Sequence, residues 1–512
     1  MTTRVPRLIG AALAAAALAV PVAQAQTTLR IGMTAADIPA TTSQPDSGFE
    51  GNRFVGLTLF DALTMWDLSS AEKPSVIIPG LATEWKVDDK DKTKWVFKLR
   101  KGATFHNGKP VTADDVVASF MHHRGSDSKS AAKSLLDPVT SIKADGAETV
   151  IFELTSGNAD FPYIASDYHI PILPRKDDGT ADWESGNRTG PYVLEKFEPG
   201  VSCTFNKNPN YFKSDKGWFD RVEFLAIKDV TARTNALNTG ETQYLHRADL
   251  KTLDLLKQNP NVAIFEKTGY GHYIYVMNVT AKPFDNQDVR NAIKYSLDRE
   301  EILAKVFSGY GSVGNDNPIA PTVKFAVDPQ PRHVYDPEMA KSLLKKAGLE
   351  SLSFDLSVSD AAFTGAVDAA LLWKEKAKAC NIEINVIREP DDGYWDNVWL
   401  KKPFVASYWA GRPTCDWMFT TAYAADAAWN DTFWKNPRFN ELLVAARAET
   451  DEAKRAAMYA EMQQLVHTDG GLVNVVFNNF VDAHAANLGH GETAANWPMD
   501  GMKITERWWF TS

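Results

Sequence analysis

The chain has little cysteine, no excess of positive charge and no internal apolar run long enough to cross a membrane. Its three cysteines, Cys203, Cys380 and Cys415, show neither C-x-x-C nor metal-ligand spacing, which excludes a disulfide scaffold and a zinc ribbon. The sequence does not decide whether two of the three form a disulfide bond, but with an odd number at least one thiol has no internal partner. The 55 Lys and Arg against 65 Asp and Glu give a net charge of −10, which argues against nucleic acid or an anionic membrane surface as a partner.

The first 25 residues have the pattern of a secretory signal peptide. Arg4 and Arg7 form a basic start, residues 8–22 are apolar, and residues 23–25 are an A-x-A cleavage site. The apolar run is shorter than the ~20 residues that a membrane-spanning helix needs. We therefore expect cleavage before Gln26, export to a periplasm, and a mature chain that does not insert into the membrane. A mature chain of this length is expected to form two or three domains.

One segment combines a strand, turns and a helix in a specific order. Trp95–Leu99 alternates large apolar residues with others, as a half-buried strand does. Asn107-Gly108 predicts a turn. Thr112 lies three residues before Asp115, which predicts a capping box at the start of a helix.

Two further blocks complete a recognisable pattern. Residues 189–212 contain T-G-P-Y and then N-P-N-Y-F, and residues 283–293 read P-F-D-N-Q-D-V-R-N-A-I. With F-H-N-G-K-P-V-T-A-D-D-V at residues 105–116, these blocks resemble the extracellular solute-binding proteins of family 5 (cluster C, the peptide, nickel and opine type). Members of this family are the receptors of ABC importers. The resemblance extends from about Leu29 to the C-terminus.

The resemblance implies an α/β fold of the type II periplasmic-binding-protein kind, with two lobes, a hinge and an extra subdomain in the first lobe. It places lobe I at residues 26–277 with the inserted subdomain at about 62–188, lobe II at 278–479, and the return to lobe I at 480–512. The residues themselves predict a strand–helix–strand unit with parallel strands at 353–388. They also predict one helix over 287–306 and a strand over 505–510.

The function implied by the resemblance is capture of a peptide or peptide-like solute between two lobes. The solute would pass to an inner-membrane ABC permease, and the receptor would be a monomer without a cofactor or a catalytic role. An anion-bearing opine- or sugar-type solute stays open as the ligand, and so does a signalling role. Nickel or haem cargo finds no ligand set here, and an exported hydrolase needs a nucleophile beside a base, which the sequence does not display.

The segment 405–419 departs from the family pattern at one position. Peptide-binding members place, three residues after a strand-ending Trp, an Asp that pairs with the α-amino group of the ligand; here Trp409 is followed by Arg412. A buried guanidinium favours a carboxylate, phosphate or sulfate instead. Asp416 is expected either to pair with Arg412 or to supply the missing negative charge. A loop ion pair that touches no ligand is the alternative.

A second departure concerns the residue for the carboxylate of the ligand. Counting back from the helix after residue 365 puts Asp360 where dipeptide binders have an Arg. In this hypothesis the site has Asp where the family has Arg and Arg where the family has Asp, so a ligand with its charges reversed in the cleft would fit. Further candidates come from loops and strand ends that face the cleft in the family, and each has core packing or a plain surface role as its alternative. They are Ser47, Asp167, Tyr168, Tyr273, Trp417, Trp429 and Asn430.

Overall fold

The computed structural model describes residues 27–33, 58–59, 61–68, 76–88, 90–130, 132–449, 451–494 and 496–511. The signal peptide expected at residues 1–25 and the ligand contact expected at Ser47 lie outside the described residues.

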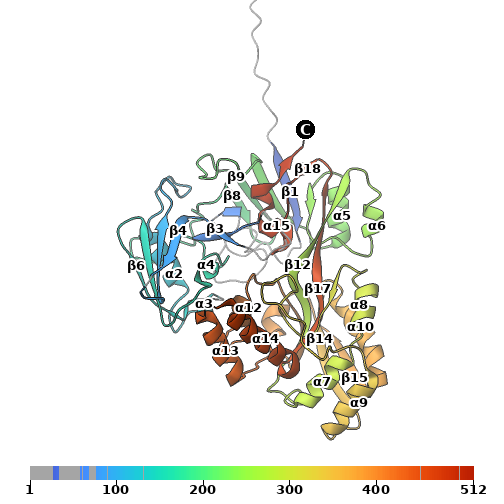
Figure 1. Ribbon diagram of the computed structural model, residues 1–512. Coiled ribbons are helices and arrows are strands. Elements are labelled where there is room, and N and C mark those ends of the chain that lie inside the picture. The colour runs from blue at the N-terminus through green and yellow to red at the C-terminus, as the bar shows by residue number, and fades with distance from the viewer. Residues whose placement is uncertain are drawn as a thin grey trace, which may run out of the picture.

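An eleven-stranded mixed sheet runs through both halves of the molecule (Figure 1). Its order is β15-β14-β16-β12-β17-β11-β1-β10-β9-β8, and β13 pairs with β17. The strands are β1 (Thr28–Met33), β8 (Tyr192–Glu198), β9 (Ser202–Lys207), β10 (Arg221–Ala226), β11 (Tyr244–Leu245), β12 (Val262–Met277), β13 (Gly311–Val313), β14 (Leu352–Val358), β15 (Ile382–Arg388), β16 (Phe404–Trp409) and β17 (Leu472–Ala485). As expected for residues 353–388, β14 and β15 are parallel and are joined by a helix.

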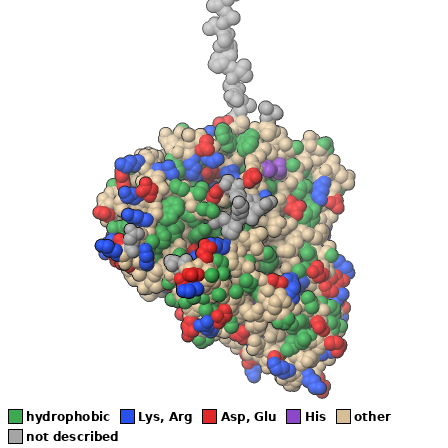
Figure 2. Space-filling view, viewed as in Figure 1, with side chains coloured by type: hydrophobic (Ala, Val, Ile, Leu, Met, Phe, Trp, Pro, Cys, Tyr) green, Lys and Arg blue, Asp and Glu red, His purple; other side chains and the backbone are tan. Residues whose placement is uncertain are grey.

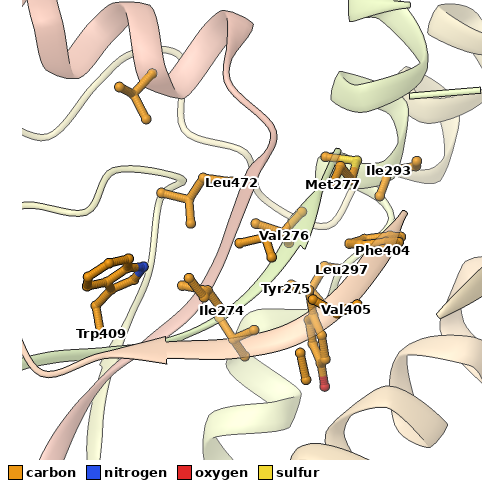
Figure 3. Packing of buried hydrophobic residues seen from close by; sticks show 14 of the residues in the cluster. Ile274, Tyr275, Val276, Met277, Ile293, Leu297, Phe404, Val405, Trp409 and Leu472 are labelled. Carbon is orange, nitrogen blue, oxygen red and sulfur yellow. The ribbon is translucent and has the colours of Figure 1, made fainter. Parts of the chain in front are cut away.

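The two largest hydrophobic clusters divide this sheet into two lobes. One cluster packs around β1, β9 and β10, and we call that half lobe I; the other packs around β14, β15 and β16, and we call that half lobe II. Figure 3 shows the second cluster where β12 and β16 meet, with Ile274, Val276 and Phe404 among the buried side chains. The two-lobed α/β fold is thereby confirmed, while the residue limits of the domains stay a prediction.

Lobe I carries a smaller antiparallel sheet in the order β4-β5-β7-β6, which lies at the left of Figure 1. Its helix α2 begins with the expected capping box, in which the Asp115 carboxylate accepts from the backbone N of Thr112 at 2.8 Å; the Thr112 Oγ1 also donates to this carboxylate, at 2.7 Å. The remaining elements of this lobe are β2 (Thr64–Trp66), β3 (Ile77–Pro79), β4 (Ala82–Val87), β5 (Lys94–Leu99), β6 (Val139–Ala144), β7 (Thr149–Leu154), β18 (Leu488–Gly489), β19 (Trp509–Phe510), α2 (Ala113–His122), α3 (Lys133–Leu136), α4 (Phe161–Ile164), α5 (Val230–Asn238), α6 (Leu253–Leu256), α15 (Pro498–Met502) and α16 (Ile504–Arg507).

Helices cover the sheet of lobe II. They are α7 (Gln287–Tyr295), α8 (Arg299–Lys305), α9 (Pro337–Lys346), α10 (Ala366–Ala377), α11 (Tyr394–Asn397), α12 (Cys415–Ala422), α13 (Pro437–Ala448) and α14 (Glu452–Asp469), with a 3-10 turn at Lys378–Cys380. The single helix expected over 287–306 is wrong. Asp298 accepts a hydrogen bond from the backbone N of Glu301 and so caps a second helix, which interrupts the first.

The strand expected over 505–510 is also wrong in its first half, which forms α16 before the short β19. All three cysteines are free and buried, so the disulfide bond left open by the sequence is not formed. None of the helices in the described ranges is both long enough and apolar enough to cross a bilayer. Figure 2 shows basic and acidic side chains mixed around the edge of the visible face rather than gathered by sign.

Candidate functional site

A cavity lies where two long strands pass from one lobe to the other. β12 and β17 pair along most of their length, and their register shifts between Thr268 and His272. Gly271 lies at this shift, where a Cβ would come within 2.8 Å of the Asn478 Oδ1. The absence of a side chain at Gly271 therefore leaves room between the strands. The cavity is lined by His246, Arg247, Ala248, Leu250, Gly271, Tyr273, Phe307, Tyr310, Thr364, Tyr408, Trp409, Ala410, Asn478, Asn479, Phe480, Val481, Asp482 and Pro498.

Aromatic side chains make up a third of the residues that line this cavity. Tyrosine, phenylalanine and tryptophan rings contribute, and the Arg247 guanidinium lies 5.9 Å from the centre of the Tyr408 ring. Asn478 and Asn479 add two amides from β17. Asp482 accepts hydrogen bonds from the Tyr244 hydroxyl at 2.6 Å and from the backbone N of Arg247 at 2.7 Å. Aromatic walls with a few fixed polar groups are typical of sites for small organic solutes.

Beside the cavity, several side chains predicted from the sequence meet across the two lobes. They are Arg412, Asp167, Tyr168, Trp409, Trp417 and Trp429, which we call the Arg412 cluster. Trp409 belongs to both the cluster and the cavity wall. The sequence predicts all of these residues for the site, and the structure brings the six together although Asp167 and Arg412 come from different lobes.

The backbone after β16 places Arg412 in this cluster. Gly411 has a φ of +80°, and a Cβ there would come within 2.4 Å of Tyr270. The chain therefore turns tightly against β12 before Thr414 caps helix α12 by accepting from the backbone N of Trp417. The turn directs the Arg412 guanidinium among three rings, at 5.8 Å from Tyr168, 5.9 Å from Trp409 and 5.7 Å from Trp417.

Lobe I contributes the negative charge. Asp167, 1% exposed, accepts from the backbone N of His169 at 2.8 Å, and its Oδ1 lies 2.6 Å from the His169 Nδ1. Burial raises the pKa of the Asp167 carboxyl, but the His169 ring and the Arg412 guanidinium outweigh burial, and the pKa is lowered overall. Asp167 is therefore an ionised carboxylate close to Arg412.

Comparisons with known proteins agree with this architecture. Residues 76–431 match the bacterial extracellular solute-binding proteins, family 5, middle region. The chain belongs to this family. It is 26% identical over 459 residues to a di/tripeptide-binding protein of Pseudomonas aeruginosa, covering 80% of this chain and 81% of that one. It is 27% identical over 471 residues to the dipeptide-binding protein of Escherichia coli, covering 82% and 85%.

Solved structures show the same fold at lower identity. The periplasmic binding protein DppA of Helicobacter pylori, in complex with the peptide STSA, superposes with a TM-score of 0.83 at 21% identity over 94% of this chain and 98% of that one. The protein AgaA of A. tumefacien R10, in complex with agropinic acid, gives a TM-score of 0.83 at 21% identity over 95% and 99%. This chain thus has the same two-lobed fold as these solved structures.

Other residues predicted for the site have different partners. Asp416 does not pair with Arg412, because its Oδ1 is 3.0 Å from the Arg447 Nε in a buried ion pair. Asn430 holds its own loop by donating to the carbonyl oxygens of Ala424 and Trp434. Tyr273 lines the cavity and stacks on Phe363 at 4.6 Å.

Asp360 lies in lobe II just before α10. It accepts from the backbone N of Val367, and burial together with Asp391 raises its pKa. Among the described residues, no contact joins Asp360 to Arg412, so the reversed-charge arrangement stays a hypothesis without geometric support. The sequence reasoning also missed Arg247, Asn478 and Asn479. The two asparagines interrupt an apolar strand, V-V-F-N-N-F-V, and that interruption was the available signal.

One buried cluster has the residue types of a metal site. Asp316, His333 and His467 present their ligand atoms within 4.8 Å of one another. The Asp316 carboxylate already binds Arg299, the backbone N of Asn474 and His333. Both ring nitrogens of His467 lie within 2.9 Å of backbone carbonyl oxygens. The ligand atoms are thus used inside the protein, beside a fixed positive charge that would repel a cation.

Proposed function

We propose that the protein is the periplasmic substrate-binding component of an ABC importer and that its solute is a peptide or a peptide-like compound. The observation that carries this proposal is the cavity at the crossing of β12 and β17. Residues of both lobes line it, so a bound solute contacts both lobes at once. Such a site works by hinge closure, in which binding stabilises the closed arrangement.

The cavity has the groups that a peptide needs. A peptide backbone offers N–H donors and C=O acceptors, and the side-chain amides of Asn478 and Asn479 can donate and accept at the same time. The rings of Tyr273, Tyr408 and Trp409 provide apolar walls for side chains. The names of the two relatives, a di/tripeptide-binding protein and a dipeptide-binding protein, support the same class of solute.

Binding without catalysis is part of the proposal. Among the described residues that line the cavity there is no serine and no cysteine, and Thr364 is the one aliphatic hydroxyl. Covalent catalysis needs a nucleophile held beside a base. We further propose that the signal peptide directs the chain to the periplasm, where a monomer delivers its solute to an inner-membrane permease.

Thermal unfolding with and without solutes tests the proposal. Dipeptides and tripeptides are added to the mature protein, and a solute at about a hundred times its Kd is expected to add ~2.7 kcal/mol to the free energy of unfolding. The variant Asn478→Ala should bind at least about tenfold more weakly by calorimetry, a loss of ~1.4 kcal/mol. Asn385→Ala, at an exposed strand position of lobe II, is the matched control and should bind like the wild type. Turnover of a peptide, or no shift with any peptide, contradicts the proposal.

A further inference from the structure

Arg412 differs from other buried arginines of lobe II in its hydrogen bonds. Arg290, Arg299 and Arg447 each donate directly to a carboxylate, at 2.8, 2.8 and 3.0 Å respectively. Arg412 is 3% exposed, yet within the described part of the chain its hydrogen bond runs from Nη1 to the carbonyl oxygen of Gly411. Its Nε is buried and meets no hydrogen-bond acceptor among those same residues. A buried guanidinium normally needs a directly bonded anion.

Asp167 precedes Tyr168, whose ring lies 5.8 Å from the Arg412 guanidinium, and it does not complete such a pair. The two charges attract each other, but no hydrogen bond joins these two described side chains. The Asp167 Oδ2 is buried and finds no hydrogen-bond donor in the described ranges, while Oδ1 is bound by His169. The Arg412 Nε, a donor from lobe II, and the Asp167 Oδ2, an acceptor from lobe I, therefore belong to one cluster of rings without a hydrogen bond between them. The rings of Tyr168, Trp409 and Trp417 stabilise the cation without directing it to a particular acceptor.

The cluster adjoins the solute cavity through one side chain. Trp409 lines the cavity, and its ring lies 5.9 Å from the Arg412 guanidinium. Arg412 is not itself a lining residue, but it lies directly beside this part of the cavity wall. A guanidinium presents a planar fork of donors that suits a carboxylate in two parallel hydrogen bonds.

We infer that the solute presents a carboxylate to Arg412, and that Asp167 is the counter-charge that Arg412 exchanges for this carboxylate on binding. The inference rests on the proposed function and narrows it to solutes with a free acid group. Arg412 acts as a specificity-determining residue. Asp167 lies on the lobe opposite Arg412 and is held there by His169. Its negative charge balances the Arg412 charge in the absence of a solute and repels the carboxylate of a bound solute, so it weakens the binding of the acid.

The test compares acids with their neutral analogues by calorimetry on the mature protein. One panel contains dipeptides and the C-terminal amide of each, and a second contains sugar acids and their methyl esters. The wild type is expected to bind acids at least about tenfold more tightly than the neutral analogues, since a charge-assisted pair is stronger than a neutral hydrogen bond. Arg412→Gln should abolish that preference, and Arg412→Lys should keep part of it. Asp167→Asn should bind acids more tightly, because the competing negative charge is removed.

The matched control is Arg438→Gln, which removes an arginine from an exposed pair with Glu461 in lobe II and should leave the preference unchanged. Equal binding of acids and neutral analogues by the wild type overturns the inference, as does an unchanged preference in Arg412→Gln that still melts cooperatively. If no dipeptide binds but a sugar acid binds in a way that depends on Arg412, the proposed peptide ligand is refuted and the inference is supported. If no compound of either panel binds, the proposed function and the inference are both refuted. Weaker acid binding by Asp167→Asn contradicts the role of Asp167.

Discussion

Asp160 of lobe I and Arg455 of lobe II form an ion pair at 2.7 Å, although 295 residues separate them in the chain. Both side chains are nearly buried, at 12% and 11% exposure. The backbone N of Ala159 donates to the carbonyl oxygen of Arg447 next to this pair. Burial raises the pKa of Asp160 even though Arg455 opposes the shift. Lobe I and lobe II are thus joined by a desolvated polar contact.

The first prediction concerns this ion pair. Asp160→Asn and Arg455→Gln should each lower the free energy of unfolding by about 2–4 kcal/mol, because each leaves one buried group without its partner. The double variant should lose less than the sum of the single losses. Urea unfolding measures these values. Arg438→Gln, which breaks an exposed pair, should change stability by less than about 1 kcal/mol. Additive losses would show that the two side chains are not coupled.

A second prediction concerns pH. Asp431 accepts a hydrogen bond from the Trp399 Nε1 at 3.2 Å, and burial raises the pKa of its carboxyl to about 7. The folded protein therefore holds a proton that the unfolded chain, with a carboxyl pKa of about 3.9, releases. The stabilisation from Asp431 is complete below about pH 4 and falls by roughly 1.4 kcal/mol per pH unit up to about pH 7. Above that pH it is lost.

Asp431→Asn removes this titration. Other carboxylates titrate as well, so the informative quantity is the difference in unfolding free energy between Asp431→Asn and the wild type. That difference should move in favour of the variant as the pH rises from about 4 to about 7, by a few kcal/mol. Denaturant unfolding at several pH values provides the measurement. Parallel stability curves for the two proteins would refute the raised pKa.

The third prediction concerns the turn that positions Arg412. Gly411→Ala should destabilise the protein by about 2–5 kcal/mol and weaken solute binding, because a Cβ at φ +80° is strained and would overlap Tyr270. Gly491→Ala is the control. Among the described residues, no heavy atom lies within 4 Å of the place that a Cβ would take at Gly491, so this variant should lie within about 0.5 kcal/mol of the wild type. Urea unfolding compares the two, and a fully stable Gly411→Ala would show that the turn can relax.

The fourth prediction concerns the buried network of lobe II. Asp316→Asn should cost about 3–5 kcal/mol, because it leaves the Arg299 guanidinium without its counter-charge. Arg299 and His333 hold the pKa of Asp316 well below its usual range although burial opposes them, so its stabilisation is present above about pH 4 and lost as the pH falls.

A chelator should leave the melting temperature unchanged. A fall in melting temperature that added zinc reverses would instead establish a metal site.

Local patterns allow many elements to be predicted from the sequence. The capping box of Thr112 and Asp115 and the parallel strands β14 and β15 are confirmed, because turns, caps and periodicity act over a few residues. The wrong helix over 287–306 has a local cause as well. The apolar periodicity continues through Asp298, whereas the side chain of Asp298 caps α8 and so ends the first helix.

The sequence by itself determined the family and many of the elements along the chain, and it predicted Trp409 and Arg412 as site residues. Only the tertiary structure decided which charges meet. Asp416 pairs with Arg447 rather than with Arg412, which is nearer in sequence, and Asp167 reaches Arg412 from the other lobe. The cavity residues Asn478 and Arg247 likewise come together through the pairing of strands β17 and β11. Attraction between charges depends on distance in space and on burial, and neither quantity follows from separation along the chain.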